Sequence, residues 1–156
     1  MPTPNPSSKA MGALATAVGW VVRSVKNDAE IMAIVNGNVG TLPFPQNIEF
    51  PAIGITMVNS GTNGVLSNVI YDSYIDLSVV GICAEDTPET VSKLAYLICN
   101  LLHDRFNTNN SPVTVNGFTY GTVTQCEYQL PVLYSHRDKE ETIWQYAGAT
   151  FRLTIE

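Results

Sequence analysis

The sequence has few charged residues and no cluster of positive charge. Charged residues make up 14% of its 156 residues, against about 25% in a typical soluble domain. The eight lysines and arginines form no run, and the formal net charge is −6, so the chain does not suit a protein that grips nucleic acid by its phosphates. A surface with so little charge is expected where other protein subunits cover part of it.

The sequence also shows no sign of disulfides, membrane spans or a signal peptide. Cys83, Cys99 and Cys126 are an odd number, lie far apart and fall within apolar stretches, so we interpret them as small buried residues in a reduced compartment. No apolar run reaches the ~18 residues that span a bilayer. Residues 1–8 lack the basic and apolar parts of a signal peptide, and we expect them to form a flexible arm on an intracellular protein.

No set of residues points clearly to a reaction. The two histidines are His103, beside an apolar pair of a predicted helix, and His136, in a charged segment. A small cytosolic enzyme that uses Cys99 or Cys126 with His103 stays open as an alternative of a different class, although nothing in the spacing unites these groups. The acidic residues are explained more simply than by a metal or catalytic role, as side chains on a solvent-exposed sheet face or as partners of a helix dipole. We therefore expect no catalytic residue, no cofactor and no metal ion.

Three segments are predicted to be helical. The first covers about residues 8–26, with an inward stripe of Met11, Leu14, Ala15, Val18, Val22 and Val25. Asn27 or Asp28 caps a short second helix, which Asn36-Gly37 closes. Thr87-Pro88 begins the third, whose inward stripe is Val91, Leu94, Ala95, Ile98, Leu101 and Leu102.

Strand patterns occupy most of the remaining sequence: residues 52–59, 69–83, 113–115, 118–120, 123–134 and 142–156. The segment around Pro43 and Pro45 reads as an extended connector with at most a short edge strand. Residues 59–64 are predicted to form a loop because they are turn formers, and Asn116-Gly117 is typical of a tight hairpin. Pro131 marks a bulge or a sheet edge.

The last strand has the clearest pattern. Its apolar residues alternate with polar ones from Ala147 to Glu156, so its backbone needs a partner in this chain or in another copy. Together the elements predict an α+β fold, in which a mainly antiparallel sheet or sandwich packs against one long N-terminal helix and one central helix. We expect a single domain over residues 9–156.

The candidate contact residues lie in a charged turn predicted at residues 135–141 and at the start of the last strand. They are Arg137, Asp138, Lys139, Glu140, Glu141, Trp144 and Tyr146, together with Asn63 and Gly64 of the predicted loop. If Ala147 faces the core, then Trp144 and Tyr146 point outward, as interface anchors do. A plain solvated turn, and burial of the two aromatics under the N-terminal helix or a loop, are the alternatives.

Three stretches carry a family resemblance: Phe50-Pro51-Ala52-Ile53 opening a strand, the helix residues Ala95, Ile98, Leu101 and Leu102, and the closing strand from Trp144 to Leu153. In this order they resemble the tail terminator, or tail completion, proteins of long-tailed bacteriophages, over most of residues 10–156. The resemblance implies a hexameric ring that caps the tail tube beneath the neck and ends tube polymerisation. It implies a place in the virion after assembly in the host cytoplasm, and no catalytic residue.

The partners implied by the resemblance are copies of the chain itself, the tail tube and the neck proteins, with no membrane. DNA would only pass through the ring, and six copies at −6 each carry about −36, which suits a channel that does not grip DNA. A head-to-tail connector and a tail tube subunit remain alternatives, because tubes and terminators use related sandwiches.

Overall fold

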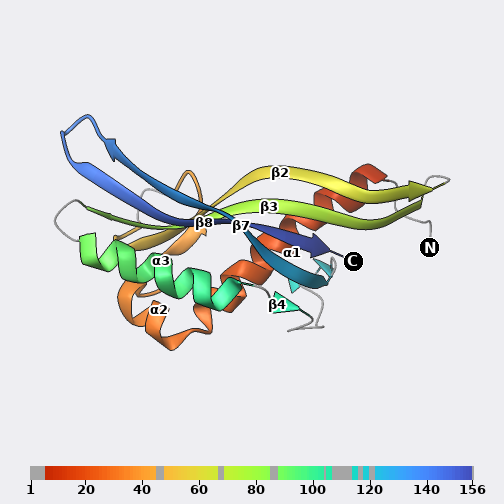
Figure 1. Ribbon diagram of the computed structural model, residues 1–156, viewed down its shortest axis with the longest axis horizontal. Coiled ribbons are helices and arrows are strands. Elements are labelled where there is room, and N and C mark those ends of the chain that lie inside the picture. Colours follow the sequence, from red (N-terminus) through yellow and green to blue (C-terminus); the bar gives the residue numbers. More distant parts are fainter. Residues whose placement is uncertain are drawn as a thin grey trace.

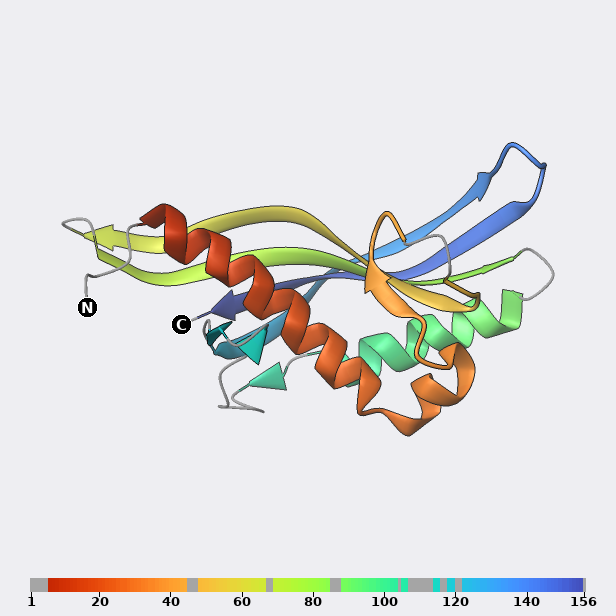
Figure 2. The ribbon, with the colours of Figure 1, turned by 180° about the vertical axis from the view of Figure 1, so that it is seen from behind.

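The computed structural model describes residues 6–44, 48–66, 69–84, 88–103, 105–106, 114–115, 118–119 and 122–155, with side chains for residues 13–44, 48–61, 74–84, 88–103 and 122–155. Its main element is a six-stranded sheet in the order β1-β2-β3-β8-β7-β4, and a separate pair of strands, β5-β6, forms a second small sheet. The helices of the described chain lie together on one face of the main sheet (Figures 1 and 2).

The helices are α1 (Pro6–Lys26), α2 (Ala29–Val35) and α3 (Pro88–Leu102). The strands are β1 (Val39–Thr41), β2 (Ala52–Leu66), β3 (Val69–Ala84), β4 (Arg105–Phe106), β5 (Thr114–Val115), β6 (Phe118–Thr119), β7 (Val123–Arg137) and β8 (Ile143–Ile155). Neighbouring strands are antiparallel except for β1 and β2. The predicted α+β class is confirmed.

The core lies between the helices and one face of the sheet, which we call the helix face; the opposite side is the outer face. Leu77 and Val79 of β3 and Phe151 of β8 are fully buried there. Val91, Leu94, Ile98 and Leu102 of α3 are buried against them, as predicted. Burial of each of these side chains is worth roughly 1.5–3 kcal/mol.

The helix signals at the start of the chain correctly predict two helices and the residues at which they end. Asp28 caps α2 by accepting a hydrogen bond from the backbone N–H of Ile31, and Asn36 ends it in a left-handed conformation. α1 ends at Lys26, as expected, but begins at Pro6, so residues 6–8 of the predicted flexible arm belong to the helix. Residues 1–5, the first part of the predicted arm, lie outside the described residues.

The predicted buried stripe of the first helix is partly wrong. The buried residues include Ala13, Ala17, Trp20, Val21 and Val25, of which only Val25 belongs to the predicted stripe. Leu14, Val18 and Val22 are only partly buried. Apolar residues surround most of α1, so their spacing does not select one face, and the small alanines allow the helix to lie close to the sheet.

The predicted loop at residues 59–64 is also wrong, because β2 continues through it to Leu66. Asn63 lies opposite Asp72 of β3, and a register shift between Met57 and Asn59 marks the start of this turn-forming stretch. Pairing with the long β3 supplies a ladder of backbone hydrogen bonds, which overrides the local preference for a turn.

The last two strands form a longer hairpin than predicted. β7 continues to Arg137, so Ser135 and His136 belong to the strand, and the turn begins at Asp138. β8 lies inside the sheet, paired with β3 on one side and with β7 on the other. The C-terminal strand therefore finds both partners within its own chain and offers no free edge.

The long strands draw the sheet out in two directions. Figure 1 shows the β2–β3 ribbon reaching one end of the long axis and the β7–β8 hairpin reaching the other. Figure 2 shows α1 crossing the sheet while the β7–β8 hairpin extends beyond the helices. Both ends of the molecule are therefore built from antiparallel ribbons.

Candidate protein interface

The turn between β7 and β8 is held by one carboxylate. Asp138 Oδ1 accepts hydrogen bonds from the backbone N–H groups of Glu140 and Thr142, and Asp138 Oδ2 accepts one from Trp144 Nε1, each at 2.9 Å. The bond from Trp144, reinforced by the two backbone bonds, holds the pKa of Asp138 below its ordinary value of 3.8. Glu141 adopts a left-handed φ of 63° within the same turn. The backbone of the turn is thus held by side-chain hydrogen bonds, and its charged residues 139–141 are exposed.

Trp144 and Tyr146 lie on the outer face, as the alternation of β8 predicts, and each meets another aromatic ring. Trp144 packs against Phe50 with ring centroids 4.5 Å apart, and Phe50 meets Phe44 edge-on at 5.8 Å. Tyr146 stacks on Tyr134 of β7 at 4.4 Å with the rings 9° from parallel. Burial, and the proximity of Tyr134, raise the pKa of Tyr146. Trp144 is therefore partly covered by the connector that follows β1, and neither ring lies under α1.

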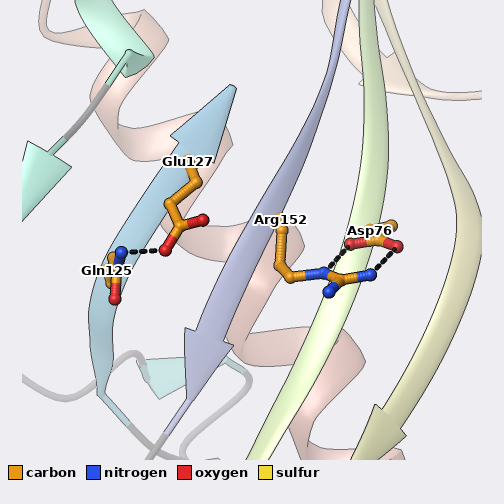
Figure 3. Close-up of polar contacts among 4 residues, drawn as sticks. All are labelled: Asp76, Gln125, Glu127 and Arg152. Atoms are coloured by element: carbon orange, nitrogen blue, oxygen red, sulfur yellow. Dashed lines mark hydrogen bonds and ion pairs between the residues drawn. The ribbon is translucent and has the colours of Figure 1, made fainter. Parts of the chain in front are cut away.

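The middle of the outer face carries a shielded ion pair (Figure 3). Arg152 of β8 donates from Nε and Nη2 to the two carboxylate oxygens of Asp76 on β3, at 2.9 and 3.0 Å. This bidentate hydrogen bond raises the pKa of Arg152, whose guanidinium also lies 4.2 Å from the centre of the Tyr74 ring. Next to it, Gln125 donates to Glu127 on β7. The polar face of β3 is thus satisfied within the chain at this point.

Exposed large apolar side chains gather on two of the long strands. On β7 they are Tyr128, Leu130, Leu133 and Tyr134, and on β2 they are Met57 and Val58. Leu133 is 81% exposed, Val58 59% and Leu130 54%. A single exposed leucine is ordinary, but several along one projecting strand are typical of a surface that meets another protein.

The sequence interpretation missed these apolar residues of β7. A usable signal was present, because residues 130–134 are apolar at every position, whereas a strand with one wet face alternates. Leu133 faces the helix side of the sheet but lies beyond the helices, so it has no cover within the described chain. Such a strand needs a second surface to bury its apolar side chains.

The predicted contact residues fall at two separate places. Arg137, Lys139, Glu140 and Glu141 are exposed at the end of the β7–β8 hairpin, around Asp138. Asn63 and Gly64 lie in β2, and their side chains are outside the described set. Because the two ribbons point to opposite ends of the molecule, the predicted residues do not form one patch (Figure 1).

The enzyme alternative concerns Cys99 of α3, Cys126 of β7 and His103, which directly follows α3. His103 follows Cys99 by one helical turn, and its backbone N–H donates to the Cys99 carbonyl at 2.8 Å. Burial raises the pKa of the Cys99 thiol, which is opposite to what a nucleophile at neutral pH requires. The His103 ring meets the Tyr128 ring edge-on, with centroids 6.0 Å apart, and Cys126 is buried.

Metal sites and membrane-spanning helices are both absent from the described part of the chain. In it, no group of three or more histidine, cysteine or acidic residues is placed to hold a metal ion. Within the same residues, no helix is long and apolar enough to cross a membrane.

Comparison with known proteins gives a likeness of fold. No protein-family model matches the sequence, and no curated protein matches it either. Among solved structures, the chain is similar to a chain in the virion of a native gene transfer agent particle. The two share 12% sequence identity, with a TM-score of 0.61 over 92% of this chain and 97% of the other. This chain therefore has the fold of a protein that is found within a virion.

Proposed function

We propose that this chain is a structural protein of a virion, and specifically a tail terminator: a ring of six copies that caps the tail tube and joins it to the neck. The observation that carries the proposal is the likeness to a virion chain over nearly the full length of both chains. A likeness that covers 97% of the other chain leaves little of it without a counterpart here.

The form of the molecule supports an assembly protein. In a closed ring, one surface of each subunit contacts a different surface of the next subunit. Each subunit therefore needs two different patches, each burying roughly 800 Å². The β2–β3 ribbon and the β7–β8 hairpin lie at opposite ends of the molecule and offer two different surfaces (Figure 1). Both carry exposed apolar side chains, Val58 on one and Leu133 on the other.

The charge and the satisfied polar groups also agree with a passive channel. The net charge of −6 provides no cluster of cations for a phosphate backbone, so DNA passes through the ring in transit and the ring does not retain it. Asp76 and Arg152 neutralise each other within the outer face. The partners of the ring are the last ring of the tail tube and the neck, with assembly in the host cytoplasm.

A deletion experiment tests this role. Removal of the gene from the virion that encodes it is expected to give tails of uncontrolled length that fail to join heads, because nothing ends tube growth. Electron microscopy of the particles measures tail length directly. Complete loss of tubes would instead indicate a tube subunit, tailless full heads with normal free tails would indicate a connector, and normal particles would contradict a structural role.

A further inference from the structure

Two stretches of the six-stranded sheet have a partner on only one side. β1 pairs with β2 only at residues 53–55, and the last bond on that side runs from Leu42 N to Ile55 O, so residues 56–66 pair only with β3 among the described residues. β4 pairs with β7 only at residues 125–126, so residues 127–137 pair, within the same part of the chain, with β8 alone. We call residues 56–66 and 127–137 the two open edges.

The two open edges carry few of the charges that protect a free strand. Monomeric proteins guard exposed edges with lysines, other charged side chains, prolines or very short strands. Residues 56–66 contain no charged residue, and on β7 the charges are confined to Glu127 and Arg137, at the two ends of its open edge. The other protective features are Pro131 and one register shift on each edge, between Met57 and Asn59 on β2 and between Tyr128 and Leu130 on β7. Exposed Leu130 and Leu133 lie on either side of Pro131. Such an edge, left bare, would pair with any extended chain, which indicates that it is covered in the assembled protein.

The directions of the strands determine how one copy can cover another. The four long strands alternate in direction across the sheet, from β2 through β3 and β8 to β7. A second copy placed beside β7 in the same orientation therefore brings its β2 antiparallel to β7. Both helix faces stay on the same side, and each copy uses a different edge toward each neighbour.

The positions of the two open edges agree with a closed ring. Across the four long strands, Gly61 pairs with Tyr74, Tyr74 with Thr154, and Thr154 with Gln125. Gly61 of β2 and Gln125 of β7 therefore lie at the same height along the strands. Matching Gly61 with Val132, the middles of the two edges, displaces the next copy along the strands by about seven residues, roughly 23 Å at ~3.3 Å per residue. Four strands at ~4.8 Å spacing are about 19 Å wide. Together these displacements tilt the strands by about 50° from the ring axis, near the ~35–45° of closed barrels.

In this register the short strands flank the joint. β1 of the next copy covers β2 just beyond Arg137, and β4 covers β7 just beyond Leu66 of the neighbour. The two open edges thus lie opposite each other along their whole length. The parts of β2 and β7 that pair with β1 and β4 lie outside the contact between copies. Gly61 and Val132 both belong to the outer face, so the alternation of side chains continues across the joint.

We propose that the open edge of β7 in one copy pairs antiparallel with the open edge of β2 in the next copy, so that the sheets of successive copies join into one continuous wall. This pairing rests on the proposed ring function and names the contact that closes the ring. It involves backbone hydrogen bonds along both edges, and it buries Leu130, Leu133 and Val58 between copies.

A cross-linking experiment tests this pairing. Ser60→Cys and Leu133→Cys place thiols at exposed positions that lie opposite each other in the register above. Full-length chains with one substitution each, carrying different tags, are co-expressed, purified and treated with a short bismaleimide. We expect mixed pairs of Ser60→Cys with Leu133→Cys at least tenfold above either identical pair. Tyr96→Cys, on the 66% exposed Tyr96 of α3, is the matched control, and the unsubstituted chain measures any reaction of Cys99.

Electron microscopy of the same samples separates the two proposals. Rings that show only identical cross-links, or none, would overturn the edge pairing and leave the ring intact. Absence of rings from every sample, the unsubstituted chain included, would contradict the proposed function as well. As a second readout, Leu130→Lys is expected to reduce ring formation at least tenfold with an unchanged melting temperature, whereas Tyr96→Lys leaves the rings in place.

Discussion

Asp138 is the residue on which the β7–β8 turn depends. Its carboxylate accepts three hydrogen bonds, whereas the neighbouring Glu140 contributes only a backbone N–H to the turn. We therefore expect Asp138→Ala to lower the melting temperature and to change the fluorescence of Trp144, while Glu140→Ala changes neither. Thermal unfolding followed by tryptophan emission measures both, and equal behaviour of the two variants would contradict the account.

The effect of Asp138 depends on pH in a direction that its pKa defines. Because the folded-state pKa lies below the ordinary 3.8, its stabilising contribution is full above that value and is lost as the pH falls through the folded-state pKa. The difference in melting temperature between the unsubstituted chain and Asp138→Ala should be constant from pH 7 to about pH 5 and shrink in more acidic buffer. A difference that grows in acid would show that another group is responsible.

Arg152 and Asp76 stabilise the sheet as a pair. Replacing Arg152 by leucine leaves the Asp76 carboxylate, only 10% exposed, without its bidentate partner. We expect a loss of unfolding free energy on the order of 2 kcal/mol. Arg152→Leu combined with Asp76→Leu should recover most of this loss, because no buried charge then remains. Urea unfolding of the two single variants and the double variant measures the coupling, and additive losses would contradict it.

Single residues were predictable from the sequence where alternation alone decides. The period of β8 placed Trp144 and Tyr146 on the outer face correctly. It could not show that Phe50 and Tyr134 cover them, because those contacts come from strands and connectors far away in the sequence. Asp138 looked like any member of a charged turn, since its role depends on where β7 ends.

The packing of β8 against β3 leaves no room for a side chain at Gly148. A Cβ at this position would collide with the backbone carbonyl oxygen of Val79 and lie 2.8 Å from the Cα of Val80. Gly148→Ala must therefore shift two central strands, and we expect a loss above about 4 kcal/mol or failure to fold. Gly40→Ala, whose Cβ meets only the Phe44 ring at 3.7 Å, is the control and should change stability by less than about 0.5 kcal/mol. Soluble yield and circular dichroism distinguish the two.

Whole elements were predicted well where one physical signal was strong. α3 has a proline start and a clear apolar stripe, and its four buried residues all belong to the expected stripe, of which Ala95 and Leu101 are only partly buried. The prediction of a loop at residues 59–64 was wrong because these turn-forming residues pair with β3, a partner that local preference does not reveal. The prediction of the buried side of α1 was partly wrong because the apolar residues of this helix are not confined to one stripe.

The main sheet of the described chain is backed by helices, and its two open edges lie toward opposite ends of the long axis (Figure 1). From the sequence, the terminal strand was expected to need a partner, and the structure places that strand inside the sheet. Among the described residues, the long stretches that pair on one side only belong instead to β2 and β7, because the order of strands in the sheet differs from their order in the chain. Sequence periodicity could predict the strands, but only the topology shows which of them lie at an edge.

Electron cryo-microscopy of the purified virion can locate this chain and show its contacts. We expect a single ring of six copies where the tail tube meets the neck, with β7 of each copy beside β2 of the next. Copies repeated along the whole tube, or a virion that lacks the chain, would contradict it.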